Sequence, residues 1–565
     1  MESRNTSKNL TKVQSRMVGL LVLLLVACAA ILVAFSLLSF HSRNHHSCRR
    51  RRPNQQSDRT LQTFVRKVCA ETLYPSLCFS TLSSMRPSDY SSHGLFIQIL
   101  EFLINQTADR VERARTSLVS HFSGIELNTP EKNALQDCME LLDQTRYELN
   151  ETIHELGMNH GYGSVKTLLS AAMTNENTCI NGFLDLEQLY PDPHSKGRVE
   201  HIQSLLIPVS QMISNSLAIT RHVEGPKSKQ QQILKKTKDL VKITTGKYKN
   251  PRPHVTVASD GSGDYKTIGE AIARAPYMGP KTHRIKIKAG VYHEHVVISR
   301  DKTNIMLIGD DMNSTIITGS RNFADGYSTF ESATLTVEGD KFLARDLTIQ
   351  NTATPEKHQA VALRVTSNAA FYRCRIISYQ DTLYAHSLRQ LYRDCSIQGT
   401  IDFIFGNAAA VFQNCRILVR QPIPGQRNMI TAQGREDPNQ NTGIILQSCT
   451  IEAATEFIPS KRRSFSTYLG RPWRNYSRTI VVNSYLGDLI HPRGWFAWNE
   501  HSNLDMVEYI ECGNSGPGAD TKRRISWAGY RKNCSEDIVT QFSVEEFLHV
   551  AGGWFESTVF PLFSS

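Results

Sequence analysis

The feature that most constrains the fold is a repeat in the second half of the chain, where a Cys-x-Ile triplet recurs. The triplets begin at Cys374, Cys395, Cys415 and Cys449, and the first three are 21 and 20 residues apart. A coil of about twenty residues with one β-branched stripe facing inward is typical of a parallel β-helix. Short Val/Ile-rich stretches separated by Gly, Asn and Asp agree with it. We therefore predict that residues 254–565 form a right-handed parallel β-helix, an all-β solenoid.

The same repeat places cysteines in neighbouring coils. Successive coils stack about 4.8 Å apart, which lies within the range of roughly 4.4–6.8 Å between Cα atoms that a disulfide spans. Cys395 can therefore reach either Cys374 or Cys415, and the spacing leaves both pairings open.

Two carboxylates and two amides follow the same period. Asp402, in the apolar run "TIDFIFGN", lies 21 residues after Asp381, and Gln380 lies 21 residues after Gln359. Each pair is thus expected to stack on adjacent coils. Neighbours in a regular strand point to opposite faces, so Gln380 and Asp381 share a site only if the chain bends between them.

Stacked carboxylates suit acid–base and nucleophilic chemistry. Their repulsion raises one pKa and leaves the other low, which gives one group to attack and one to donate a proton. Glutamine amides can donate hydrogen bonds to a developing oxyanion. The competing interpretation is a ladder of polar side chains that only satisfies the turns of a solenoid.

The N-terminal region is predicted to enter the secretory pathway. Residues 17–40 carry no charge and would form a helix of about 36 Å, enough to cross a bilayer core of about 30 Å. We expect a transmembrane signal-anchor behind a basic cytoplasmic tail (1–16), with a signal peptide cleaved after Ala27–Ala30 as the alternative. A basic linker (41–59) follows. Five glycosylation motifs begin at Asn105, Asn150, Asn313, Asn475 and Asn533.

Residues 60–222 are predicted to be a helical domain. Apolar positions recur at three and four spacing in several long segments, which favours an antiparallel four-helix bundle. Four cysteines lie here: Cys69, Cys78, Cys138 and Cys179. The following linker, 223–253, is rich in lysine, and we expect it to be solvated and open to proteases.

The net charge of +11 indicates an anionic partner. The chain has no Cys-x-x-Cys or zinc-finger spacing and its basic residues are spread out, so we expect no nucleic-acid binding. A membrane surface or an acidic polysaccharide remains.

Six motifs in order resemble the plant pectin methylesterases (pectinesterases): "VASDGSGDYKTI" (257–268), "GVYHE" (290–294), "QAVAL" (359–363), "QDTL" (380–383), "DFIFG" (402–406) and "LGRPW" (469–473). Upstream, "VCAETLYPSLC" (68–78) resembles the plant pectin methylesterase inhibitors. The resemblance implies hydrolysis of methyl esters of homogalacturonan (pectin), behind an N-terminal region that inhibits the enzyme or helps it to fold.

The resemblance also implies roles for single residues. Asp402 is the nucleophile, Asp381 is the acid and then the base, and Gln380 with Gln359 stabilises the tetrahedral intermediate. Arg471 pairs with Asp402 and holds it ionised.

Further groups follow from the same resemblance. Trp473 and Thr329 contact the sugar chain, with Phe405, Trp495 and Tyr384 as weaker candidates. The implied disulfides are Cys395–Cys415, Cys69–Cys78 and Cys138–Cys179. Neither a metal nor an organic cofactor is implied, and His358 and His386 are expected to be surface or supporting groups.

The expected partners are pectin, a proteinaceous inhibitor, a processing protease and a membrane bound through residues 17–40. The expected location is the cell wall.

Two other functions are compatible with parts of the pattern. One is a non-catalytic protein whose bundle inhibits other esterases. The other is a β-helix that cleaves glycosidic bonds, for which an inverting hydrolase needs carboxyls roughly 6.5–9.5 Å apart and a lyase needs calcium ligands.

Overall fold

The computed structural model of the protein describes residues 55–88, 91–158, 163–189, 194–223, 252–500 and 502–549. The predicted tail 1–16, the apolar segment 17–40, most of the basic linker and residues 224–251 of the Lys-rich linker lie outside these ranges.

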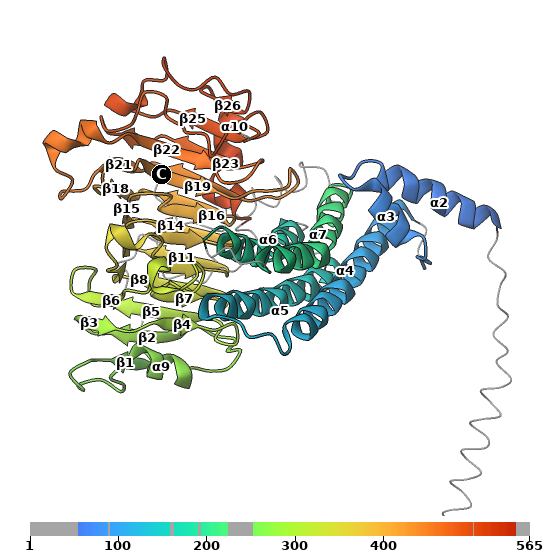
Figure 1. The fold of residues 1–565 in the computed structure, drawn as a ribbon, viewed down its shortest axis with the longest axis horizontal. Coiled ribbons are helices and arrows are strands. Elements are labelled where there is room, and N and C mark those ends of the chain that lie inside the picture. Colours follow the sequence, from blue (N-terminus) through green and yellow to red (C-terminus); the bar gives the residue numbers. More distant parts are fainter. Residues whose placement is uncertain are drawn as a thin grey trace, which may run out of the picture. The chain divides into compact units, whose positions relative to one another are not determined.

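The described chain is helical from residue 55 to residue 223 (Figure 1). The helices of this region are α2 (Gln55–Cys69), α3 (Pro75–Leu82), α4 (Ser92–Phe122), α5 (Thr129–Met158), α6 (Gly163–Leu189) and α7 (Ser195–Thr220). Helix α4 contacts α5, α5 contacts α6, α6 contacts α7 and α7 contacts α4, which closes a four-helix bundle. The predicted fold of this region is confirmed.

Local sequence explains where α5 begins. Asn128 accepts a hydrogen bond at Oδ1 from the Glu131 amide (2.9 Å), and its own amide donates to Glu131 Oε2 (2.9 Å). This reciprocal pair satisfies amides that the first turn of α5 leaves without helical partners.

Among the described residues α7 alone is long and apolar enough to span a membrane, but its residues Leu206 and Ile213 are fully buried, as expected for a core helix.

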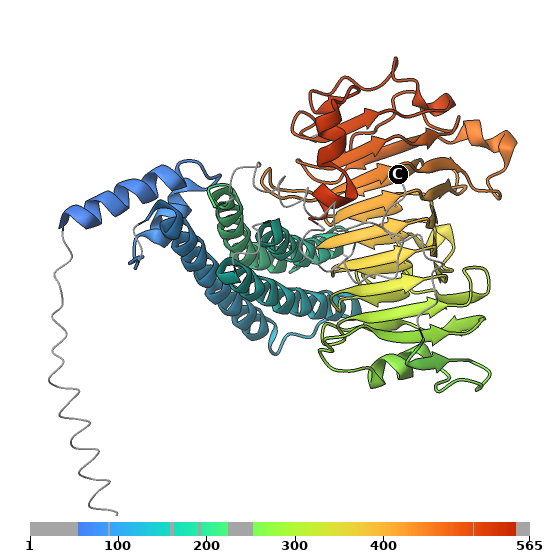
Figure 2. The same ribbon diagram turned by 180° about the vertical axis from the view of Figure 1, so that it is seen from behind.

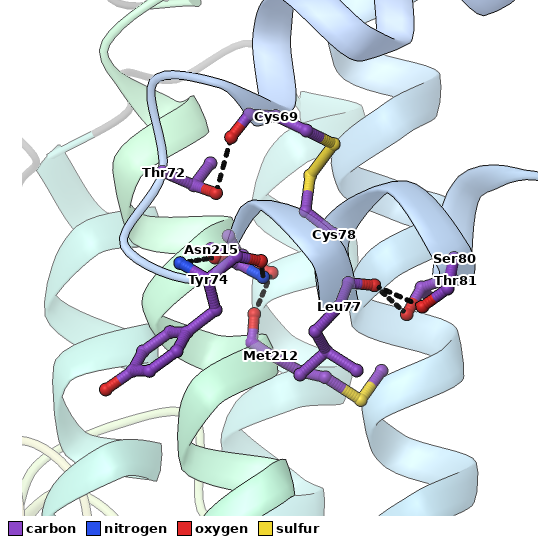
Figure 3. The surroundings of a disulfide bond; sticks show 10 residues. Cys69, Thr72, Tyr74, Leu77, Cys78, Ser80, Thr81, Met212 and Asn215 are labelled. Atoms are coloured by element: carbon purple, nitrogen blue, oxygen red, sulfur yellow. Dashed lines mark hydrogen bonds between the residues drawn. A yellow bond between two sulfur atoms is a disulfide. The ribbon is translucent and has the colours of Figure 1, made fainter.

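Two disulfides hold the bundle together, Cys69–Cys78 and Cys138–Cys179, both as predicted. The first joins α2 to α3 (Figure 3). In the loop that it closes, the Tyr74 amide donates to Asn215 Oδ1 of α7 (3.2 Å). The second joins α5 to α6.

The rest of the described chain, from residue 252, is a parallel β-helix, as predicted, and every strand pairing in its three sheets is parallel. Figures 1 and 2 show the strands stacked coil upon coil. The first sheet contains β1 (Val255–Val257), β2 (His283–Ile287), β5 (Ile305–Gly309), β8 (Phe342–Arg345), β11 (Ala369–Tyr372), β14 (Arg389–Arg393), β17 (Ala409–Gln413), β20 (Gly443–Gln447), β23 (Arg478–Val482), β25 (Glu508–Cys512) and β26 (Tyr530–Arg531).

The second sheet contains β3 (Gly290–His293), β6 (Thr315–Gly319), β9 (Thr348–Asn351), β12 (Arg375–Ile377), β15 (Ser396–Gly399), β18 (Arg416–Val419), β21 (Thr450–Ala453) and β24 (Tyr485–Leu486). The third contains β4 (Val296–Ile298), β7 (Leu335–Val337), β10 (Leu363–Val365), β13 (Leu383–Ala385), β16 (Ile404–Gly406), β19 (Asn428–Gln433) and β22 (Thr467–Pro472). Short helices α9 (Ile268–Arg274), α10 (Glu536–Gln541) and α11 (Val544–Phe547) lie near its ends in the sequence.

The predicted inward stripe exists. Ile376, Ile397, Ile417 and Ile451 stand in register on neighbouring strands of the second sheet, and all four are fully buried. The buried hydrophobic clusters of the β-helix contain only residues from 257 onward. The β-helix therefore has a core of its own.

The cysteines of this ladder are not paired as the resemblance implied. Cys374, Cys395, Cys415 and Cys449 are buried free thiols, so the Cys395–Cys415 disulfide is not formed in the structure. The thiol of Cys395 donates to the Arg393 carbonyl (3.3 Å) and that of Cys415 to the Tyr392 carbonyl (3.3 Å). Backbone oxygens thus accept the thiol protons that a disulfide would remove. A disulfide that we did not predict joins Cys512 to Cys534.

Candidate active site

Asp381 and Asp402 lie at the bend that leads into the third sheet. Each precedes its strand by two residues, and the first residues of the two strands, Leu383 and Ile404, pair in register. Both aspartates adopt a left-handed backbone, with φ of 61° and 49°, which Asp tolerates better than most residues. The bend that the sequence required is therefore present, and the two carboxylates stand on adjacent coils.

The two glutamines occupy the same edge. Gln359 pairs with Gln380 in an isolated parallel bridge, so these residues also lie one coil apart. Because Asp381 turns the chain directly after Gln380, the side chains of both residues reach one cavity, which Gln359 and Asp402 line as well.

Arg471, on β22, forms a two-pronged ion pair with Asp402. Its Nε donates to Oδ1 (2.9 Å) and its Nη2 to Oδ2 (2.5 Å). Asp402 is 5% exposed and Asp381 is 8% exposed. A guanidinium fork on a nearly buried carboxylate fixes both its charge and its orientation.

These contacts separate the two carboxyl groups. Burial raises the pKa of Asp381 well above its usual value, the negative charge of Asp402 raises it further, and Arg471 acts in the opposite direction. Burial also raises the pKa of Asp402, but both the charge and the hydrogen bonds of Arg471 oppose that increase. The proton of the pair therefore resides on Asp381 and the negative charge on Asp402.

Aromatic side chains line the cavity, which has a volume of about 420 Å³. The rings of Tyr384 and Phe405 stack with centroids 4.2 Å apart, and Trp473 lies 6.1 Å from Phe405. Thr329 is also in the wall. Phe405 and Tyr384, weaker candidates from sequence, thus lie at the site.

Trp495 does not line this cavity. It is fully buried and its indole donates to Glu511 (2.9 Å). Trp498, which sequence reasoning missed, lines the wall instead, under the guanidinium of Arg471 at 4.0 Å from the ring centroid. The two tryptophans are three residues apart in the sequence, and no periodicity there separates the core residue from the cavity residue.

Part of the cavity wall comes from the helical bundle, which we did not predict. Helix α6 contributes Thr178, Asn181 and Asp185. Thr178 shares a hydrogen bond with His386 Nε2 (2.9 Å), and Arg474 donates to Asn181 Oδ1 (2.5 Å).

Helix α5 adds a further contact with the β-helix: Ser328 donates to Asp137 Oδ2 (2.5 Å). The small polar side chains of α6 and the acid of α5 therefore dock the bundle over the two catalytic candidates. No local sequence pattern predicts these contacts, because each joins residues more than a hundred positions apart.

No histidine among the described residues lines this cavity. His386 is fully buried, and burial lowers its pKa to about 3, so the imidazole is neutral. His358 is exposed. Within the described ranges, no group of three or more His, Cys, Asp and Glu residues is arranged to hold a metal ion.

Comparison with known proteins gives a consistent result. Residues 254–551 match the pectinesterase family, and residues 63–219 match the plant invertase/pectin methylesterase inhibitor family. Pectinesterase 3 of Citrus sinensis is 42% identical over 522 residues, covering 88% of each chain. Pectinesterase/pectinesterase inhibitor U1 of Solanum lycopersicum is 41% identical over 526 residues, covering 89% of each.

Among solved structures, the pectin methylesterase from carrot is 51% identical, with a TM-score of 0.55. It is matched over 99% of its own length by 56% of this chain, which corresponds to the β-helix. The carrot structure therefore has no region that corresponds to the bundle, in agreement with the separate core seen here.

Proposed function

This chain belongs to the pectinesterase family, and on that premise we propose that Asp402 is the nucleophile and Asp381 the acid–base group of its reaction. The chain is a pectin methylesterase with an inhibitor-like region ahead of the enzyme. It hydrolyses the methyl esters of pectin and leaves free galacturonate carboxylates. The observation that supports the assignment of roles is the fork from Arg471 to Asp402, beside an Asp381 that retains its proton.

The reaction proceeds in two stages. The Asp402 carboxylate attacks the carbonyl carbon of the ester, and the negative charge moves to the carbonyl oxygen. The amides of Gln380 and Gln359 donate hydrogen bonds to that oxygen. Asp381 then protonates the methoxy group, so that methanol leaves and the substrate acyl group remains on Asp402.

In the second stage Asp381, now ionised, takes a proton from water. The resulting hydroxide attacks the acyl carbon, and Asp402 leaves as a carboxylate. Because Arg471 stabilises the ionised form of Asp402, it favours both its readiness to attack and its departure. Trp473 and Thr329 line the cavity, which supports the proposal that they hold the sugar chain.

We further propose that the bundle inhibits the enzyme to which it is joined. Thr178, Asn181 and Asp185 occupy the wall of the catalytic cavity, where a polymer chain would have to lie. Inhibition in trans, the alternative function of the bundle, would use the same surface, which here is engaged by the enzyme of its own chain.

Release of the active β-helix would then require a protease that cuts the Lys-rich linker. The same proposal includes attachment of the intact chain to a membrane through residues 17–40 and delivery of the enzyme to the cell wall. The basic net charge supports retention of the enzyme on the polyanionic product.

The test is methanol release from highly methylated pectin by four proteins: the intact chain, the β-helix alone (residues 254–565), and each with Asp402→Asn. We expect the β-helix to be active, the intact chain to be much slower, and both variants to be inactive. A β-helix that keeps its rate with Asp402→Asn would contradict the role of this residue. An intact chain that releases methanol as fast as the β-helix would contradict the proposed inhibition but not the role of Asp402.

A further inference from the structure

A row of residues in register crosses the third sheet, and all of them except Arg364 line the catalytic cavity. Arg364 pairs with Tyr384, Tyr384 with Phe405, Phe405 with Ala432, and Ala432 with Arg471. Residues in register lie on the same face of a sheet. Arg471 serves the reaction centre, whereas Arg364 has no part in the mechanism above.

Arg364 lies to one side of the reaction centre. Its strand, β10, is separated by β13 from β16, which begins directly after Asp402. Two strand spacings amount to about 10 Å. A polymer that continues from the cavity across the strands would therefore place a different sugar unit near Arg364 from the one whose ester is hydrolysed.

The guanidinium of Arg364 is held flat but only partly satisfied. It stacks on the Phe330 ring, 3.3 Å from the centroid, and its Nη2 donates to Glu338 Oε1 (3.0 Å). The residue is 5% exposed, yet its Nε and Nη1 have no hydrogen-bond partner. Two buried N–H donors without partners are costly and leave this edge of the fork able to bind a ligand.

In the resting chain the bundle supplies a carboxylate at that edge. Glu140, on α5, places Oε1 3.6 Å from Arg364 Nη1, an ion pair without hydrogen-bond geometry. Glu140 reaches Arg364 from outside the β-helix, so removal of the bundle opens the same approach to the substrate. A planar guanidinium held against an aromatic ring is well suited to bind a carboxylate through two hydrogen bonds.

We propose that Arg364 is a specificity-determining residue that binds a free galacturonate carboxylate on a sugar unit away from the reacting ester, and that Glu140 occupies this place in the intact chain. The inference rests on the proposed function. Because the enzyme itself generates such carboxylates, Arg364 favours chains that are already partly demethylated.

The test compares two substrates of one length, a fully methylated hexagalacturonide and the same oligomer with some free carboxylates. The assay is methanol release by the β-helix alone, reported as the ratio of kcat/KM for the two. We expect the wild type to prefer the partly demethylated oligomer, and Arg364→Gln to reduce this preference by roughly tenfold, the worth of a charge-assisted hydrogen bond. Arg416→Gln, on β18 of the second sheet, is the matched control and should keep the wild-type ratio.

A ratio that is the same in Arg364→Gln as in the wild type, or a wild type without any preference, would overturn the inference while leaving the proposed function intact. If the wild-type β-helix released no methanol from either oligomer, the proposed function would fail, and the subsite with it.

A binding measurement covers the case in which Arg364→Gln does not fold. By calorimetry, fully demethylated trigalacturonate should bind the wild-type β-helix at least roughly tenfold more tightly than the intact chain, in which Glu140 occupies the site. Glu140→Gln in the intact chain should narrow that gap. Equal affinity of the β-helix and the intact chain, or a gap that Glu140→Gln leaves unchanged, would contradict the inference without any variant of Arg364.

Discussion

Replacement of Arg471 by glutamine should shift the pH dependence of the enzyme as well as slow it. The variant loses both hydrogen bonds to Asp402 (2.9 and 2.5 Å) and leaves a carboxylate that is 5% exposed without its cation. Removal of one partner from a buried ion pair costs about 3–5 kcal/mol. Without Arg471, only the effect of burial on Asp402 remains, so its pKa rises further.

The sign of the rate effect follows from that pKa. At acidic pH the nucleophile of the variant is protonated, and a carboxylate destabilised by about 3 kcal/mol relative to its neutral form is ionised roughly a hundredfold less often, which lowers the rate by the same factor. As pH rises the carboxylate ionises and part of the rate returns, so the ascending limb of the profile moves to higher pH. The assay is the initial rate of methanol release by the β-helix from pH 5 to pH 9 on methylated pectin.

The matched control is Arg478→Gln. Arg478 also forms an ion pair with a partly buried acid, since its Nε donates to Glu508 (2.6 Å), but it does not line the cavity. This variant should lose stability in thermal unfolding and keep the wild-type pH profile. A uniform loss of rate at every pH in Arg471→Gln, or no loss, would refute the reasoning about the nucleophile.

Three further predictions concern the bundle and the core. Asn181→Ala removes the acceptor of Arg474 and should raise the methanol release of the intact chain up to about tenfold, for a lost charge-assisted bond of about 1.5 kcal/mol; an unchanged rate would argue against this contact as part of the inhibition. Burial raises the pKa values of Glu148 and Glu176 to about 8, so both side chains keep their protons in the folded bundle at pH values where a glutamate of the unfolded chain has already lost its proton. The free energy of unfolding in urea should therefore fall between about pH 4.5 and pH 8, by up to roughly 1.4 kcal/mol per pH unit and group. The variant with both residues replaced by Gln should flatten this slope, and a slope that the variant leaves unaltered would contradict the prediction. Ile417→Ala, in the inward stripe, should cost the β-helix about 2–5 kcal/mol in denaturant unfolding; a cost below about 1 kcal/mol would show that the stripe is not well packed.

The repeat in the sequence predicted the residues that recur once per coil, and it predicted few of the contacts that occur only once. Asp381 and Asp402 were found from a 21-residue spacing, because each coil places the same position at the same bend. Their left-handed backbone explains why Gln380 and Asp381 share a site although they are neighbours. Arg471 was found only through the resemblance, since no spacing links a residue on β22 to the bend before β16.

The bundle contacts and the cysteines show the limits of that reasoning. Thr178 forms a hydrogen bond with His386, 208 positions away in the sequence. A small polar residue on a helix does not by itself indicate which distant residue it will contact. Cys374, Cys395 and Cys415 stand close enough for two pairings, and the structure has neither. Geometry permits a disulfide but does not require one when backbone carbonyls accept the thiol protons.

The protonation states of the two aspartates test the central claim most directly. Infrared difference spectra of the intact chain near pH 6, wild type minus variant, report which carboxyl carries a proton through its carbonyl stretch. The account predicts that Asp381→Asn removes one protonated-carboxyl band and that Asp402→Asn removes an ionised carboxylate band instead. Loss of the protonated band in Asp402→Asn would contradict the assignment of Asp402 as the nucleophile and Asp381 as the acid.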